Sequence, residues 1–297
     1  MIDPRTPILV GCGQITDTTG APSSARSNVA FCAEAARLAL ADAMPAIGSE
    51  ALGRQIDAVA VLEFFPDVSP RFASPFGRCT NPPKGVANRL GALPRQALYT
   101  HSGGNMPQYL VNRFAEEIAN GDTDLALVCG AELLRSNQNA RKAGLKIDWN
   151  EDPGGEPTRV GDRRFGFSEE ENRHELRAAI HFYPLIENAI RGGLGRDVDS
   201  HMAAMGRLFA RLAAVAKANP LATRREGYSA ERLSTISPDN RWICFPYPRL
   251  MNSNAMIDQS SAVLVTSVEK AREWGIPQDR WVFLHGCADG TDTWVAV

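Results

Sequence analysis

The segment from Tyr99 to Glu132, YTHSGGNMPQYLVNRFAEEIANGDTDLALVCGAE, constrains the fold more than any other part of the chain. It begins as the end of an apolar strand and turns through the polar and glycine residues 102–105. Apolar side chains then recur at regular spacing: Met106, Leu110, Phe114 and Ile118. This spacing predicts a helix with one buried face. The run DLALVCG that follows is apolar almost throughout, which is typical of a strand buried on both faces of a parallel or mixed sheet.

The rest of the chain alternates between strand and helix patterns. The sequence predicts these elements: strands over 7–14, 56–65, 95–100 and 261–267, helices over 27–44, 81–92, 175–193, 197–220 and 268–276, and a last strand that begins at Trp281. This alternation argues for an α/β fold built from layers around a sheet. The last strand must pair with the first unit or with another chain, or it remains an exposed edge.

Charge and composition exclude several classes of function. The 297 residues carry 32 basic and 34 acidic side chains, a formal net charge of −2, so no field of one sign can attract nucleic acid or an anionic membrane. The apolar stretches are too short to cross a bilayer, and the first residues lack the pattern of a signal peptide. We therefore expect no nucleic-acid partner, no membrane association and a cytoplasmic location.

Two patterns argue against familiar cofactor sites. The six cysteines, at positions 12, 32, 79, 129, 244 and 287, include no CxxC pair, so we expect reduced, mostly buried thiols and no metal site. The stretch GCGQIT lacks the third glycine of a dinucleotide-binding turn because Thr16 stands there, and a loop follows where a helix is needed. A nicotinamide site is therefore not expected.

Taken together, the segments resemble the N-terminal half of the thiolase superfamily, notably sterol-carrier-type thiolases and thiolase-like proteins labelled acetyl-CoA acetyltransferase. TPILVGCGQITD is similar to the family's first strand. The segment Tyr99–Glu132 is similar to its nucleophile turn, the following helix and a strand that ends in glycine-x-glutamate. DNRWICFPYPRLMNSNAMIDQSSAVLVTSVEKAREWGIP is similar to the end of its loop domain and to the last strand and helix of that half.

The resemblance implies an α/β, thiolase-like layered fold in which helices flank a mixed sheet and a helical loop domain is inserted. It divides the chain into four parts: 1–135 as the first part of the N-terminal core, 136–248 as the inserted loop domain, 249–279 as the final strand and helix of the core, and 280–297 as the start of a truncated C-terminal half. It also implies acyl-CoA acyltransferase chemistry in lipid metabolism, with a coenzyme A thioester as substrate or ligand and no tightly bound cofactor.

The nucleophile that the resemblance implies is missing from the turn. In the family, a cysteine sits at the start of this helix, where unpaired amides and the helix dipole stabilise a thiolate. Counting back from the helix end at Gly121 places that position near Gly104, which has no side chain. Its neighbours Gly103 and Asn105 offer no thiol, and Asn105 is instead a candidate helix cap.

Other residues could stand in for the nucleophile or the catalytic pair. Ser102 is either an acyl acceptor or a turn serine bonded to backbone; we favour the turn role because its neighbour His101 points to the opposite face of the strand. We expect His101 to be a hydrogen-bonded pocket or core residue. The family's other catalytic residues lie in its C-terminal half; His285 and Cys287 do not match them, and we expect both to pack in the core.

Candidate coenzyme A contacts follow from the same resemblance. Asn252 and Asp258 match polar positions of the family pattern, and Asn254 stands where a serine near the pantetheine is expected; turn capping is the alternative role. Arginines suit the phosphates, and the candidates are Arg173, Arg207, Arg211, Arg224 and Arg225. A solvated helix face is the alternative for each of them.

Two functions remain open. The chain is either an acyltransferase that needs catalytic residues from elsewhere, or a non-catalytic acyl-CoA-binding or partner subunit on a thiolase scaffold. A piece of a longer protein is compatible with both. Partners expected from the resemblance are acyl-CoA and either a second copy, paired through DLALVCG or a neighbouring strand as a sheet edge, or a separate subunit that supplies a C-terminal half.

Overall fold

The computed structural model describes residues 2–68, 70–162 and 167–291. The chain divides into two compact units, one formed by Met1–Arg163 with Met256–Gly290 and the other mainly by Arg164–Ala255. Residues 136–162, which the resemblance assigns to the inserted domain, group with the first unit. Residues 292–297, the end of the expected C-terminal part, lie outside the described residues.

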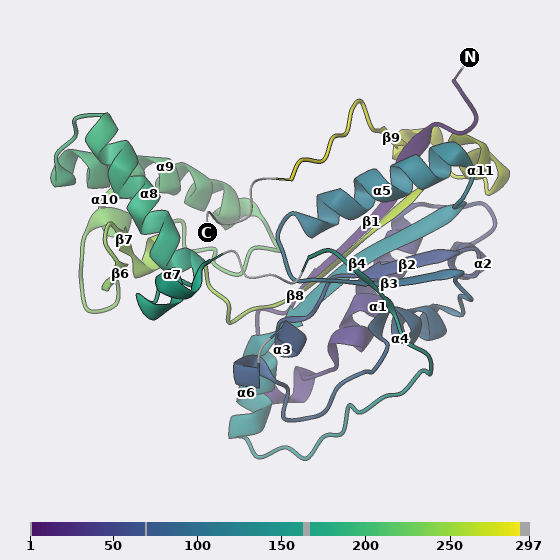
Figure 1. The fold of residues 1–297 in the computed structure, drawn as a ribbon, viewed down its shortest axis with the longest axis horizontal. Helices are drawn as coiled ribbons and strands as arrows, with labels where there is room; N and C mark the ends of the chain where they lie inside the picture. Colours follow the sequence, from purple (N-terminus) through teal and green to yellow (C-terminus); the bar gives the residue numbers. More distant parts are fainter. Residues whose placement is uncertain (1, 69, 163–166, 292–297) are drawn as a thin grey trace. The chain divides into compact units, whose positions relative to one another are not determined.

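The first unit is built around a mixed seven-stranded sheet in the order β5-β3-β2-β4-β8-β1-β9. Its strands are β1 (Pro7–Thr16), β2 (Ala58–Val61), β3 (Gln96–Thr100), β4 (Leu125–Leu133), β5 (Thr158–Val160), β8 (Asp258–Ser267) and β9 (Val282–Phe283). β2 pairs in parallel with β3 and β4, and β5 pairs in parallel with β3. β8 runs antiparallel to β4 and β1 (Figure 1). The expected mixed sheet is confirmed.

Two expectations about sheet edges are resolved by this topology. β4, which contains DLALVCG, lies between β2 and β8, so it is an interior strand and cannot pair with a second copy; neither can its two neighbours. That prediction was wrong because an apolar run buried on both faces belongs inside a sheet. The last strand pairs within the first unit, where Val282 and Phe283 of β9 lie opposite Leu9 and Ile8 of β1.

Helices cover both faces of the sheet (Figure 1). The helices of the first unit are α1 (Asn28–Asp42), α2 (Ser49–Gly53), α3 (Phe65–Val68), α4 (Pro82–Leu90), α5 (Met106–Asn120), α6 (Leu134–Lys142) and α11 (Val268–Glu273), with 3-10 turns η1 (Pro22–Ser24), η2 (Pro70–Phe72) and η4 (Gln278–Arg280). One core cluster joins α1 and α4 to one face of the sheet. A second cluster joins the apolar side of α5 to the opposite face, as its spacing predicts. The result is a helix–sheet–helix arrangement.

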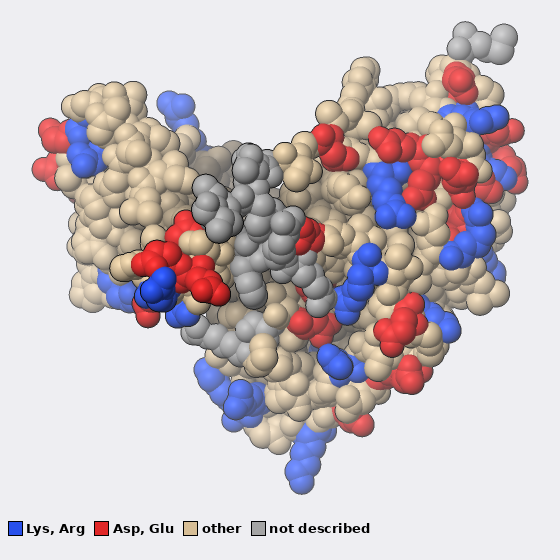
Figure 2. Space-filling view, viewed as in Figure 1, with Lys and Arg blue, Asp and Glu red and all other residues tan. Residues whose placement is uncertain are grey.

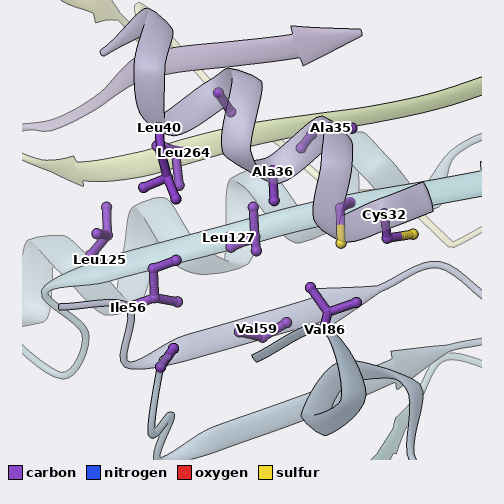
Figure 3. Packing of buried hydrophobic residues seen from close by; sticks show 14 of the residues in the cluster. Cys32, Ala35, Ala36, Leu40, Ile56, Val59, Val86, Leu125, Leu127 and Leu264 are labelled. Atoms are coloured by element: carbon purple, nitrogen blue, oxygen red, sulfur yellow. The ribbon is translucent and has the colours of Figure 1, made fainter. Parts of the chain in front are cut away.

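The helix α1 approaches the sheet closely because small side chains face it. Figure 3 shows Cys32, Ala35 and Ala36 of α1 over Leu127 of β4. A Cβ added at Gly13 of β1 would lie 2.1 Å from a backbone oxygen of α1. The glycines of the GCG stretch therefore allow this close helix–strand packing. Ser27 begins α1 as its N-cap, where its Oγ accepts a hydrogen bond from the amide of Ala30.

The second unit is helical and has a small core. Its elements are α7 (Glu169–Arg173), α8 (Ala179–Gly193), α9 (Val198–Ala218), α10 (Ala230–Ser234), the hairpin strands β6 (Trp242–Cys244) and β7 (Tyr247–Pro248), and the 3-10 turn η3 (Arg249–Met251). The buried cluster consists of Met202, Met205, Leu233 and Met251. A polar link joins α8, α9 and β7: Glu187 accepts a hydrogen bond from Tyr247 and pairs with Nε2 of His201 at 2.7 Å.

Three further observations bear on the sequence predictions. Of the six free cysteines, Cys32 and Cys129 alone are buried, so the thiols are less buried than expected. His285 and Cys287 are exposed and do not pack in the core. In the part of the chain that the structure describes, no helix is long and apolar enough to span a membrane. Figure 2 shows basic and acidic side chains interspersed on the face in view, as the charge balance predicts.

Candidate functional site

The turn that joins β3 to α5 brings its backbone to the start of a long helix. The amide of His101 donates to the oxygen of Val160 in β5 at 2.9 Å, and the amide of Met106 donates to the oxygen of Gly103 at 3.1 Å. Asn105 occupies the N-cap position in a helical conformation, and its side chain makes no capping hydrogen bond. The prediction that it caps α5 is therefore wrong. The first-turn amides of α5 gain no acceptor from that side chain.

A pocket of about 340 Å³ opens at this end of α5. It is lined by Gln14, Leu62, Glu63, Ser102, Gly103, Gly104, Gly130, Ala131, Glu132, Ile257, Gln259, Ser260 and Ser261. A Cβ added at Gly104 would meet nothing within 4 Å, so this position faces open space. No thiol lies among these described lining residues. The structure thus provides room for a side chain at the expected nucleophile position and leaves it vacant.

Glu132, at the C-terminal end of β4, is the pocket residue that sequence reasoning missed. Its Oε1 accepts a hydrogen bond from the amide of Phe65 at 2.8 Å. Its Oε2 is buried and has no hydrogen-bond partner among the described residues. Burial raises the pKa of this carboxyl to about 7, and the negative charge of Asp67 acts in the same direction. The sequence signal for Glu132 is the glycine-x-glutamate element at the end of this strand.

A second pocket carboxylate, Glu63, is held by an ion pair. Its Oε1 lies 3.2 Å from the guanidinium of Arg159, and its side chain is 5% exposed. The same guanidinium stacks over the ring of Tyr99 at 4.6 Å. The hydroxyl of Tyr99 donates to Asp67 at 2.5 Å, and the amide of Phe64 donates to that hydroxyl at 3.0 Å. Glu63 is therefore engaged in a structural network, unlike Oε2 of Glu132.

The turn residues His101 and Ser102 differ in their surroundings. The ring of His101 packs against Gly161, whose φ of +96° and lack of a side chain make room for it, since a Cβ there would lie 1.8 Å from Nδ1. Nδ1 is buried without a partner among the described residues, so the expected hydrogen bond of this ring nitrogen is missing. Ser102 lines the pocket, but no described base is hydrogen-bonded to its hydroxyl. Activation of Ser102 has no support in the geometry.

The candidate coenzyme A residues are placed in different units. Asp258 is 1% exposed, and its carboxylate accepts the amide of Ser136 at 3.1 and 3.0 Å. Burial raises the pKa of Asp258 above its usual range, and the bonds to Ser136 act against this. Asn252 belongs to the second unit, where it donates to the oxygen of Pro248 at 3.0 Å, and Asn254 is exposed there. Asp258 therefore lies in the first unit, whereas Asn252 and Asn254 lie in the second.

The candidate arginines all lie on the surface of the second unit. Arg207, Arg211, Arg224 and Arg225 are exposed, and Nε of Arg225 donates to the oxygen of Lys217 at 3.3 Å. Arg173 is exposed and pairs with Glu170. Among the residues that the structure describes, no group of three or more histidine, cysteine, aspartate or glutamate side chains could hold a metal ion.

No family model matches the sequence, and no curated protein matches it. The structure is similar to a monomeric SCP2-thiolase-like protein type 1 from Mycobacterium smegmatis, at 32% identity and a TM-score of 0.71, over 96% of this chain and 51% of that one. The chain therefore spans about half the length of that structure.

Two thiolase-type enzymes share the fold at lower identity. An acetyl-CoA acetyltransferase from Syntrophomonas wolfei is 17% identical, with a TM-score of 0.55, over 92% of this chain and 67% of that one. Human mitochondrial 3-ketoacyl-CoA thiolase in complex with CoA is 13% identical, with a TM-score of 0.50, over 94% of this chain and 68% of that one. At these identities the likeness concerns the fold alone.

Proposed function

Because this chain belongs to the thiolase-like superfamily by its fold, we propose that it is an acyl-CoA-binding protein whose pocket at the start of α5 receives the thioester end of the ligand. By itself it does not take up the acyl group. Acyltransferase chemistry of the thiolase type, as in lipid metabolism, would need catalytic residues from another chain or from a further part of this protein.

The observation that carries the proposal is the vacant position at Gly104 beside an uncapped helix start. The dipole at a helix N-terminus attracts a partially negative oxygen, such as that of a thioester carbonyl. The open space at Gly104 lets this oxygen approach the backbone without a side chain between them. A thiolase of the same fold is named as a complex with CoA, which supports coenzyme A as the carrier.

The absence of a nucleophile argues against acyl transfer by the described residues. Thioester chemistry of this type needs a thiolate or an activated hydroxyl close to the carbonyl carbon. The described lining residues include no cysteine, and Ser102 has no neighbouring base hydrogen-bonded to it. From the resemblance, Asn252, Asn254, Arg224 and Arg225 of the second unit remain proposed contacts for coenzyme A, and Asp258 has a structural role that competes with binding.

Partners belong to the proposal as well. The chain spans about half the length of its SCP2-thiolase-like relative, so a separate subunit that supplies a C-terminal half is one possible partner. A second copy is another, although that relative is named as monomeric. Six free cysteines and the absence of a CxxC pair support a reducing compartment such as the cytoplasm.

Isothermal titration with acetyl-CoA and with CoA tests binding, and intact mass spectrometry after incubation tests acylation. We expect binding heat and no added acetyl group. Gly104→Leu should abolish binding by filling the pocket, whereas Gly192→Leu, at a helical glycine of the second unit whose added Cβ also meets nothing, should bind normally. Lack of heat and of a thermal shift with the wild type contradicts the binding proposal. A covalent acetyl adduct on residues 99–112 contradicts the non-catalytic part.

A further inference from the structure

A pocket of about 450 Å³ lies between helices α1, α2 and α4 of the first unit. These helices pack on the face of the sheet opposite α5, so this pocket is separate from the one at the start of α5. Its volume is in the range of small-molecule sites. The residues that line it are Arg37, Leu40, Ser49, Glu50, Arg54, Arg89, Leu90 and Gly91.

The lining residues carry an excess of positive charge. They include three arginines and a single acidic side chain, Glu50, although the whole chain has a formal net charge of −2. Arg89 is compensated from outside the pocket, because its two terminal nitrogens lie 2.6 and 2.7 Å from the carboxylate of Glu151. Arg54 lies 3.8 Å from Glu50, whose side chain is 93% exposed, and such an exposed pair is weak.

Arg37 of α1 has no carboxylate partner among the described residues. Its Nη2 donates to the backbone oxygen of Arg89, near the end of α4, at 2.9 Å. This bond holds the guanidinium at the edge of the pocket, and its remaining N–H groups have no acceptor among the described residues. A guanidinium that is held in place and not neutralised is suited to bind an anion.

The floor of the pocket is apolar. Leu40 is 3% exposed and belongs to the core cluster, and Leu90 packs against the same cluster. The turn after α4 comes close to Arg54, since a Cβ added at Gly91 would lie 3.7 Å from the Cγ of that arginine. An apolar floor with a few charged groups above it is typical of a small-molecule site. A ligand that fits therefore has an anionic group and an apolar body.

We propose that the pocket between α1, α2 and α4 binds a small phosphate monoester. The phosphate lies against the guanidinium groups of Arg37 and Arg54, and the organic group covers Leu40 and Leu90. A phosphate monoester carries nearly two negative charges at neutral pH, which matches two guanidinium groups better than the single charge of a carboxylate does. This site is additional to the proposed acyl-CoA site and does not depend on it.

Titration calorimetry at a pH of about 7.5 and low ionic strength tests the proposal, with phenyl phosphate as the probe. We expect phenyl phosphate to bind about 10-fold more tightly than inorganic phosphate, which lacks the apolar body, and more tightly than benzoate, which lacks the second charge. Arg37→Gln should weaken the binding of phenyl phosphate by about 10-fold, and Arg54→Gln should weaken it as well.

The matched control is Arg241→Gln. Arg241 is also exposed, donates to a backbone oxygen, that of Trp242 at 3.0 Å, and has no carboxylate partner among the described residues, but it lies in the second unit. Its replacement should leave the affinity unchanged.

Absence of heat with phenyl phosphate overturns the proposal. The same holds if Arg37→Gln and Arg54→Gln bind like the wild type, or if Arg241→Gln weakens binding as much as they do. Equal affinity for benzoate contradicts the choice of a phosphate. The result with acetyl-CoA has no bearing on these outcomes, so the two proposed sites stand or fall separately.

Discussion

At the scale of single residues, Gly104 is the position that decides between binding and acyl transfer. A thiol placed there would sit at the positive end of the α5 dipole, which lowers a thiol pKa. We therefore expect Gly104→Cys to be alkylated by iodoacetamide faster at pH 7 than the native Cys12, whose pKa is raised by burial and by Asp42. Peptide mass spectrometry over a pH series measures both rates.

The matched control is Gly192→Cys, which places a cysteine in the last turn of α8, where the dipole has the opposite sign. It should react more slowly at neutral pH than Gly104→Cys. Equal pH dependence at the two positions would contradict the assignment of a thiolate-stabilising helix start. If acetyl-CoA acetylates Gly104→Cys and not Gly192→Cys, the thioester reaches the position of residue 104.

Glu132 should also make the folding stability depend on pH. Its folded pKa is raised to about 7, so folding favours the protonated form. At a pH below the pKa that Glu132 has in the unfolded chain, the carboxyl is protonated in both states and does not lower the folding stability. As the pH rises from there through about 7, the folding stability falls. A shift of this size corresponds to about 3 kcal/mol. Relative to the wild type, Glu132→Gln should therefore gain about 3 kcal/mol in unfolding free energy between pH 4 and pH 8.

Urea denaturation of both proteins at several pH values measures this difference, and the other titrating groups cancel in the comparison. A difference that stays constant with pH would show that Glu132 is ionised without penalty in the folded chain. The measurement is independent of any ligand, so it tests the electrostatics of this buried carboxyl by itself.

At the scale of elements, the contact between β1 and α1 depends on glycine. A Cβ at Gly13 would lie 2.1 Å from the backbone oxygen of Ala35, and helix backbone cannot yield without moving α1. We expect Gly13→Ala to cost about 3 kcal/mol of unfolding free energy. The control is Gly130→Ala in β4, where the nearest atom is a Leu62 side-chain carbon at 3.4 Å, an ordinary contact. It should cost less than about 1 kcal/mol, and equal losses would contradict the close approach.

The starts of α1 and α5 should respond differently to mutation. Ser27 accepts a hydrogen bond from the amide of Ala30, so Ser27→Ala should lower stability by about 1 kcal/mol. Asn105 makes no capping bond, so Asn105→Ala should change stability by no more than about 0.5 kcal/mol. Thermal or urea unfolding measures both. A cost of 1 kcal/mol or more for Asn105→Ala would place a cap at α5 that the geometry does not show.

The elements differ in how far the sequence predicts them. α5 and β4 carry strong periodic or continuous apolar patterns, and the structure has both. β5 has only three residues and lies in a polar, glycine-rich stretch, so neither its length nor its sequence pattern predicts a strand. The pocket is more difficult to predict from the sequence than the elements are. The Glu132 carboxylate is oriented by a hydrogen bond from the amide of Phe65, which is 67 residues away in sequence. Such pairings depend on tertiary contacts that local patterns do not encode.

At the scale of the whole molecule, association of two copies would need a surface other than β4, because β4 lies inside the sheet. Helix α9 carries an exposed apolar surface, which we call the α9 stripe. It consists of Leu208, Leu212 and Val215, which are 57%, 58% and 70% exposed. These side chains continue, at spacings of three and four residues, the face on which His201 and Met205 are buried. Exposed apolar stripes of this kind favour association. We expect the chain to self-associate through the α9 stripe as its concentration rises.

The prediction is tested by light scattering over a concentration series. The double variant Leu208→Lys with Leu212→Lys should lower the apparent mass at high concentration towards that of the monomer, because two charges are placed in an apolar contact. Leu93→Lys is the control: this leucine is 91% exposed in the first unit and lies outside the stripe, so its replacement should leave association unchanged.

A wild type that stays monomeric throughout, or association that persists in the double variant, would contradict the role of the stripe.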